Sequence, residues 1–120
     1  MKTCLVIDDS PALRTVARRI LEELQFAVSE AEDGMAGLRA CRENMPDLVF
    51  LDWNMPHMKG VEFVKGLRGQ QYGDHPRILF CTTEHDKNEI ANAIAAGANE
   101  FVMKPYDRTQ IRAKLAMLAA

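Results

Sequence analysis

Side chains that could do chemistry stand at the carboxyl ends of four short apolar runs in this sequence. They are Asp8, Asp9, Asp52, Thr82 and Lys104. Asp52 is the most informative, because a strand as apolar as the preceding "LVFL" is normally buried on both faces and does not end on a charge. Open parallel sheets bind ligands outside the carboxyl ends of their strands. If the four runs are strands of one such sheet, the five side chains face a common crevice.

The residue types in this crevice are those of phosphoryl transfer assisted by a metal ion. Three neighbouring carboxylates repel one another, which makes it costly to keep all of them ionised. Mg2+ relieves that cost, since it binds one or two carboxylates and commonly accompanies phosphate groups. Lys104 can place a positive charge on a phosphoryl oxygen, and Thr82 can donate a hydrogen bond. Asp52 is the predicted nucleophile, because a buried strand would hold its carboxylate and aspartates accept phosphoryl groups covalently.

The elements that would position these side chains alternate between apolar strands and amphipathic helices. We expect strands at 4–7, 27–31, 48–52, 77–82 and 100–103, and helices at 11–24, 34–43, 61–67, 87–96 and 107–118. Strict alternation of this kind indicates an α/β fold with a doubly wound, five-stranded parallel sheet. The apolar stripe of the first helix comprises Leu13, Val16, Ala17, Ile20, Leu21 and Leu24. In the second helix, Met35, Leu38 and Cys41 are expected to point inward.

Length and composition favour one ordinary globular domain over residues 1–120. The chain has 120 residues, of which 48% are hydrophobic and 27% charged, values typical of globular proteins. A net charge of -2 with dispersed basic residues argues against nucleic acid or an anionic membrane as partner. The start of the chain resembles no signal peptide, and no apolar stretch approaches the roughly 20 residues of a membrane span. A cytoplasmic location is therefore expected.

Several other residues have simpler structural interpretations. Three cysteines are an odd number without metal-like spacing, and Cys4 and Cys81 are expected to be small core residues of a reduced protein. The three histidines, His57, His75 and His85, lie in separate loops, so no shared metal site is predicted. His57 and His85 would flank the crevice. Trp53 is expected to be partly exposed. The arginines at 14, 18 and 19 have the spacing of a solvated helix face.

Taken together, the residues at the strand ends resemble the receiver domain of two-component response regulators, the CheY-like family, over the whole chain. The resemblance matches Asp8 and Asp9 to the acidic pair, Asp52 to the phosphoacceptor, Thr82 to the switch hydroxyl, and Lys104 and Pro105 to the lysine and proline that follow the last strand. The stretch "DWNMP" from Asp52 resembles the phosphorylation loop of the chemotaxis regulator, and Phe101 falls at the aromatic switch position.

The resemblance implies a strand order of 2-1-3-4-5 and a mechanism. Mg2+ would be bound by Asp8, Asp9, Asp52 and the backbone carbonyl of Asn54. A histidine kinase or histidine phosphotransfer protein would phosphorylate Asp52, and the chain would catalyse only its own phosphorylation and dephosphorylation. Thr82 and Phe101 would then move inward and remodel the surface of residues 87–96, 100–103 and 107–118, to which a downstream protein binds. The family resemblance further implies a monomer.

Two details at the site also follow from the resemblance. A cis peptide bond is expected between Lys104 and Pro105, so that the amine turns back over the strand ends. Thr83 departs from the family pattern, which usually has a small residue, typically alanine, after the switch hydroxyl. A branched side chain at this position would crowd solvent or a partner phosphatase beside the phosphoryl site.

Alternative functions remain on the same residues. The leading interpretation is a switch resembling the chemotaxis regulator, and the nearest alternative is an intermediate phosphate carrier or sink in a phosphorelay. An aspartate-nucleophile phosphatase would resemble the pattern Asp-x-Asp, whereas Asn54 follows here two residues after Asp52. A flavodoxin-type electron carrier would need a phosphate loop rich in Thr, Ser and Gly, and the acidic pair at Asp8 and Asp9 would repel a flavin phosphate.

Overall fold

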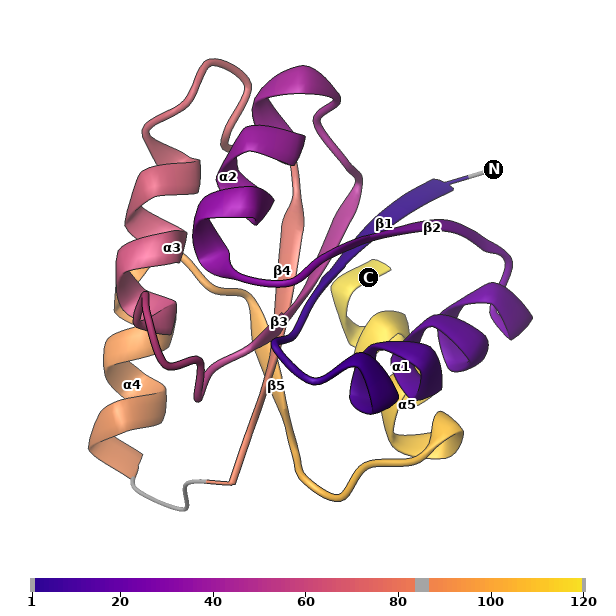
Figure 1. Ribbon diagram of the computed structural model, residues 1–120. Helices are drawn as coiled ribbons and strands as arrows, with labels where there is room; N and C mark the ends of the chain where they lie inside the picture. The colour runs from indigo at the N-terminus through magenta and orange to yellow at the C-terminus, as the bar shows by residue number, and fades with distance from the viewer. Residues whose placement is uncertain (1, 84–86, 120) are drawn as a thin grey trace.

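Five strands and five helices alternate along the part of the chain that the computed structural model describes, residues 2–83 and 87–119 (Figure 1). The elements are β1 (Lys2–Ile7), α1 (Pro11–Glu23), β2 (Phe26–Ala31), α2 (Gly34–Glu43), β3 (Leu48–Asp52), α3 (Gly60–Arg68), β4 (Arg77–Thr82), α4 (Lys87–Ala96), β5 (Glu100–Met103) and α5 (Arg108–Ala119). Every expected element is present, and the bounds shift by up to two residues. The expectation that the chain forms a doubly wound α/β domain is confirmed.

The strands form one parallel sheet in the order β2-β1-β3-β4-β5, which confirms the expected topology. After β1 the chain adds β2 on one side, and it then crosses to the other side for β3, β4 and β5. The strand order therefore reverses between β1 and β3. Ligands of open α/β sheets bind at such a reversal, outside the carboxyl ends of the strands. Asp8 and Asp52 follow or end the two strands at this point.

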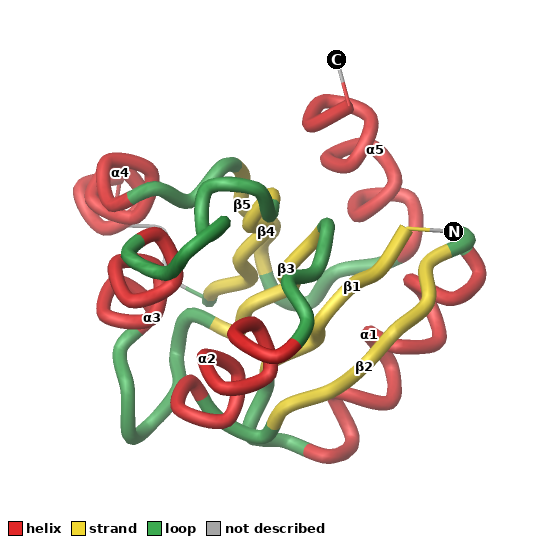
Figure 2. Tube along the Cα trace, turned by 90° about the horizontal axis from the view of Figure 1, so that it is seen from above, coloured by secondary structure: helices red, strands yellow, loops and turns green. Residues whose placement is uncertain are grey.

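Helices cover both faces of the sheet, with α2, α3 and α4 on one face and α1 and α5 on the other (Figure 2). Successive strand residues point to opposite faces, so the apolar runs supply two cores at once. In β3, Val49 and Leu51 belong to the core under α2 and α3, whereas Leu48 and Phe50 belong to the core under α1 and α5. This double burial explains why β3 is apolar until Asp52.

Glycines decide how closely α2 approaches the sheet. Gly34 and Gly37 are buried, and a Cβ atom at Gly37 would lie 2.5 Å from Cδ1 of Ile7. The prediction that Met35 points inward is wrong, since 54% of this residue is exposed. The backbone of α2, rather than a large side chain, contacts the sheet at this turn, and Met35 is consequently turned to solvent.

The buried stripe of α1 is narrower than the sequence pattern predicted. Ala17 and Leu21 are buried, whereas Leu13 and Val16 are exposed. The helix begins at Pro11 after Ser10, whose hydroxyl accepts a hydrogen bond from the backbone N–H of Leu13. A single side-chain cap of this kind holds the first turn without burying it. The predicted apolar stripe is therefore only partly buried, and Leu13 and Val16 lie outside the core.

Three remaining expectations concern the cysteines, one proline peptide bond and the length of the helices. Cys4, Cys41 and Cys81 are buried free thiols, as the core interpretation requires. The peptide bond between Lys104 and Pro105 is cis, as expected. Among the described residues, the helices are all too short or too polar to cross a membrane.

Candidate functional site

Three carboxylates meet at the edge of the sheet where the strand order reverses. Asp8 and Asp9 follow β1, and Asp52 ends β3. One oxygen of each lies within 4.8 Å of the others. Asp8 and Asp52 are only 4% and 3% exposed, whereas Asp9 is exposed to solvent. The predicted acidic cluster therefore exists, with two buried members and one at the mouth.

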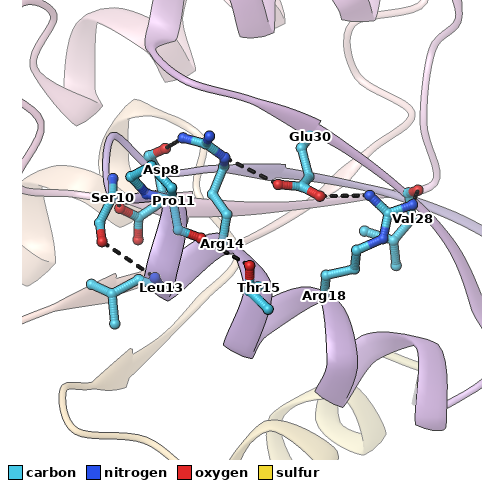
Figure 3. Close-up of polar contacts among 9 residues, drawn as sticks. All are labelled: Asp8, Ser10, Pro11, Leu13, Arg14, Thr15, Arg18, Val28 and Glu30. Atoms are coloured by element: carbon cyan, nitrogen blue, oxygen red, sulfur yellow. Dashed lines mark hydrogen bonds and ion pairs between the residues drawn. The ribbon is translucent and has the colours of Figure 1, made fainter.

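A network that ties β1, α1 and β2 together positions the acidic turn. The backbone N–H of Ser10 donates to Oδ1 of Asp8 over 2.9 Å. Arg14 donates from Nη1 to the backbone carbonyl of Asp8 over 2.7 Å and from Nε to Glu30 over 3.1 Å (Figure 3). Arg18 also pairs with Glu30 and donates to a backbone carbonyl of β2. The interpretation of these arginines as a solvated face holds for Arg19, which is exposed. It is wrong for Arg14 and Arg18, because both connect α1 to β2.

Asp52 is held through one of its two carboxylate oxygens. Oδ1 accepts hydrogen bonds from the backbone N–H of Asn54 over 3.1 Å and from Nζ of Lys104 over 2.8 Å. Within the described chain, Oδ2 accepts no hydrogen bond. Lys104 follows β5, the strand that pairs with β4. The sequence prediction that Lys104 and Asp52 face the same crevice is confirmed by this contact.

Burial and neighbouring charge shift the acid–base equilibria of the site. Burial raises the pKa of Asp8; the N–H of Ser10 lowers it, and the negative charge of Asp52 raises it again. Burial by itself would lower the pKa of Lys104, but the hydrogen bond and charge of Asp52 raise it above its ordinary value. The site therefore resists ionisation of a second buried carboxyl group and keeps its lysine positively charged.

The end of β4 joins the same edge through Asn54. The side-chain oxygen of Asn54 accepts two hydrogen bonds. The hydroxyl of Thr82 donates one over 3.5 Å, and the backbone N–H of Thr83 donates the other over 3.3 Å. The backbone N–H of Lys104 donates to the carbonyl of Thr82 over 2.9 Å. Thr82 is buried and Thr83 is exposed. The predicted hydroxyl thus ends β4 and the predicted amine follows the adjacent strand β5, at the edge of the sheet that carries Asp52.

A row of aromatic rings runs from the site along the face of the sheet. Trp53 packs on Phe80 with 4.6 Å between ring centroids, and Phe80 lies 5.9 Å from Phe101. The prediction that Trp53 is partly exposed is wrong, because it is 6% exposed. Gly60 makes room for the indole, since a Cβ atom there would lie 2.2 Å from the ring.

The two ends of this row connect to α4 and α5, a feature that sequence reasoning missed. The indole Nε1 of Trp53 donates to Glu89 of α4 over 3.0 Å. Lys114 of α5 places its Nζ 4.8 Å from the ring centroid of Phe101 and pairs with Glu100 over 3.3 Å. Phe101 is half-buried, so its ring lies between the core and the surface of α5. No spacing in the sequence marks these side-chain partners.

The two histidines that the structure describes, His57 and His75, lie in different loops. His57 is exposed in the loop after β3. His75 contacts Asp47 over 2.9 Å at the amino ends of the strands, far from the cluster. His85, which was expected to flank the crevice, lies outside the described residues.

The donor set at the cluster fits a hard divalent cation. Its ligand atoms are carboxylate oxygens, which are the donors that Mg2+ prefers in proteins. Two of the carboxylates are buried and close enough to repel one another, and a bound cation relieves that repulsion. A carboxylate, a lysine and a hydroxyl beside such a cation can bind and react with a phosphoryl group.

The sequence and the fold also match known proteins. The model of the response regulator receiver domain matches residues 4–116. The chain therefore belongs to the receiver domain family of two-component signalling. It is 32% identical to the chemotaxis protein CheY-3 of Vibrio cholerae over 92% of this chain and 86% of that protein. It is 30% identical to the chemotaxis protein CheY of Pseudomonas aeruginosa, over 92% of this chain and 90% of that protein.

Solved structures give the same result for the fold. The chemotaxis protein CheY4 of Vibrio cholerae superposes with a TM-score of 0.92 at 31% identity, and the match covers 98% of both chains. The receiver domain of a sensor histidine kinase from Pseudomonas aeruginosa superposes with a TM-score of 0.86 at 24% identity, over 97% of this chain and 95% of that one. That structure has a magnesium ion coordinated in its active site cleft.

Proposed function

We propose that residues 1–120 act as one receiver that takes a phosphoryl group from a histidine kinase, or from a histidine phosphotransfer protein, onto Asp52. The observation that carries the proposal is the cluster itself. Asp8, Asp9 and Asp52 offer oxygens within 4.8 Å of one another, and Lys104 lies 2.8 Å from Asp52. Membership of the receiver family makes phosphorylation of the buried strand-end aspartate the chemistry that suits this cluster.

In the transfer, an oxygen of Asp52 attacks phosphorus while the bond to the donor's histidine nitrogen breaks, and the imidazole keeps the electron pair. Oδ2 suits the attack, since the hydrogen bonds that Asp52 accepts within the described chain all involve Oδ1. Asp8, Asp9, Asp52 and the backbone carbonyl of Asn54 would hold Mg2+, which supplies positive charge to the phosphoryl oxygens. Lys104 binds another phosphoryl oxygen, and Thr82 donates its hydroxyl to a third.

The output follows from the residues that respond to the phosphoryl group. Lys104 leaves its contact with Asp52 to bind the phosphoryl group, and Thr82 moves toward it. Phe101 then turns inward beside Phe80, and the surface formed by α4, β5 and α5 changes shape. A downstream protein binds this surface, as suits a relative of chemotaxis proteins. The chain is thus a monomeric signalling protein in the cytoplasm that catalyses only its own phosphorylation and dephosphorylation.

Incubation with acetyl phosphate and Mg2+, followed by intact mass measurement, tests the chemistry. We expect the mass of one phosphoryl group to be added, and to be lost after treatment with hydroxylamine, which cleaves acyl phosphates. Asp52→Asn should abolish the addition, whereas Asp74→Asn, in an exposed loop, should leave it unchanged. Phosphorylation of Asp52→Asn at the wild-type rate would exclude Asp52 as the acceptor.

Lys104→Ala separates phosphorylation from switching. The charge-assisted contact of the lysine contributes about 1.5–3 kcal/mol, and without it the variant should accept the phosphoryl group but fail to bind the downstream protein. Wild-type binding by phosphorylated Lys104→Ala would contradict this role. Fast return of the phosphoryl group to a histidine phosphotransfer protein, with no third protein bound, would instead identify the phosphorelay carrier.

A further inference from the structure

A cavity lies at the edge of the sheet opposite the acidic cluster, where the strands begin. Its volume is about 520 Å³, within the roughly 300–1,000 Å³ typical of small-molecule sites. Five apolar side chains form its walls, and they come from the end of α1, where Leu24 is the C-cap, and from β2, β3 and α5. They are Leu24, Phe26, Leu48, Leu115 and Leu118. Four of the five are only partly buried, so the core under α1 and α5 is open to solvent on this side.

Three cations surround this apolar cavity. Lys2 begins β1, Arg77 begins β4, and Arg112 lies in the first half of α5. All three are exposed, and within the described chain none of them makes an ion pair. Guanidinium groups in particular offer several donors with the planar geometry that carboxylates and phosphates accept. The rim therefore holds positive charge that no side-chain carboxylate of the described residues pairs with.

The one acidic residue of the rim is already engaged. Asp47 accepts hydrogen bonds from the backbone N–H of Thr3 over 2.8 Å and from its hydroxyl, and its other oxygen contacts His75 over 2.9 Å. The N–H of Thr3 and the contact with His75 also lower the pKa of Asp47. With the carboxylate of Asp47 directed to these partners, the four charged residues of the rim leave an excess of two positive charges.

We propose that this cavity binds a small amphipathic carboxylate, with its apolar body against the leucines and its carboxylate on Arg77 and Arg112. The apolar walls exclude a purely ionic ligand such as acetate, because only burial of apolar surface gains free energy there. A metal cation is excluded by the excess positive charge. The concave shape suits a compact molecule rather than a flat macromolecular surface. The site is separate from the acidic cluster, which lies at the other ends of the same strands.

Octanoate is a suitable probe, with octan-1-ol and acetate as probes that lack one half of the chemistry. Each is titrated into isotopically labelled protein without Mg2+, and amide chemical shifts are recorded. We expect saturable shifts with octanoate, centred on Leu48, Leu115 and the start of β4, weaker binding of octan-1-ol and no saturable binding of acetate. Arg77→Gln and Arg112→Gln should each weaken octanoate binding about threefold to tenfold, as for a lost charged contact.

Arg39→Gln is the matched control, because Arg39 is an exposed arginine of α2 on the other face of the sheet. It should bind octanoate as the wild type does. The amide spectra themselves report whether each variant is folded. Equal affinity for octanoate and octan-1-ol, unchanged affinity in both arginine variants, or no saturable shifts would overturn the proposal. So would self-association through this face at rising protein concentration, which would make a second copy of the chain the occupant.

Discussion

Asp8→Asn should stabilise the metal-free protein while it weakens Mg2+ binding. Asp8 is 4% exposed, and its carboxylate has an oxygen within 4.8 Å of one from Asp52. Two unit charges at that separation repel by about 3 kcal/mol at an effective dielectric constant of about 20. In the wild type, the backbone N–H of Ser10 donates to Oδ1 of Asp8. Asparagine removes the charge but keeps an oxygen that can accept this hydrogen bond.

The net gain is smaller than this repulsion, because Asp8 also attracts Lys104. We therefore expect the free energy of unfolding to rise by about 1–2 kcal/mol at pH 7.5, and the melting temperature by several degrees. Asp9→Asn is the matched control: it removes a neighbouring carboxylate that is exposed, so it should weaken Mg2+ binding with little change in metal-free stability.

The dependence on pH has a definite sign. The pKa of Asp8 is raised in the folded protein, chiefly by burial, so ionisation of Asp8 is less favourable folded than unfolded. The destabilisation is absent below the ordinary pKa near 3.9 and is complete above the raised folded pKa. The advantage of Asp8→Asn should thus grow as the pH rises through this window. Urea unfolding with EDTA, at several pH values, measures it.

Addition of Mg2+ should reverse the order of stability. A ligand that binds only the folded state adds about 2.7 kcal/mol at a concentration 100 times its dissociation constant, and this gain belongs to the wild type. A folded Asp8→Asn protein that is no more stable than the wild type in EDTA at pH 7.5 would refute the reasoning. It would mean that the buried carboxylate is not under electrostatic strain.

Three further outcomes test other contacts. Arg14→Met should weaken Mg2+ binding about threefold to tenfold in a titration of tryptophan fluorescence, because the acidic turn loses the hydrogen bond to the Asp8 carbonyl. Arg18→Met should leave Mg2+ binding unchanged, and equal effects of the two substitutions would contradict the role of Arg14 in positioning Asp8. Gly60→Ala should lower the free energy of unfolding by about 1–3 kcal/mol through overpacking, whereas Gly69→Ala, with room for a Cβ atom, should be tolerated; equal stability of the two variants would argue against the tight contact at the indole. Cys41, whose pKa burial raises to about 11, should not react with a thiol reagent at pH 8 until the protein unfolds, and rapid modification of the native protein would contradict its burial.

The strand ends were the predictable part of this protein. A strand end is fixed by the apolar run before it, and alternation of strands and helices fixes which strand ends share an edge. Asp8, Asp52 and Lys104 could therefore be placed together from the sequence. The strand order itself came from the resemblance to a family, because alternation alone does not say on which side of β1 the third strand is added.

Helix faces were less predictable, because apolar spacing gives the direction of a side chain but not the distance of the helix from the sheet. In α2, Gly37 brings the backbone against Ile7, and this closeness leaves Met35 in solvent. Arg14 was misassigned for a related reason. Charged residues at helical spacing usually indicate a solvated face, but a long side chain near the first turn reaches the loop before its own helix, as the contact with the Asp8 carbonyl shows.

The burial of Trp53 and its contact with α4 could not be predicted from the sequence. A residue that follows a strand is expected in a loop. Only the close contact with Gly60, which depends on the whole path of the loop after β3, reveals that the ring is buried. Its indole N–H then bonds to Glu89 of α4, while its neighbour Asp52 belongs to the acidic cluster. Because Asp52 and Trp53 are adjacent in the chain, these two residues connect the acidic cluster directly to α4.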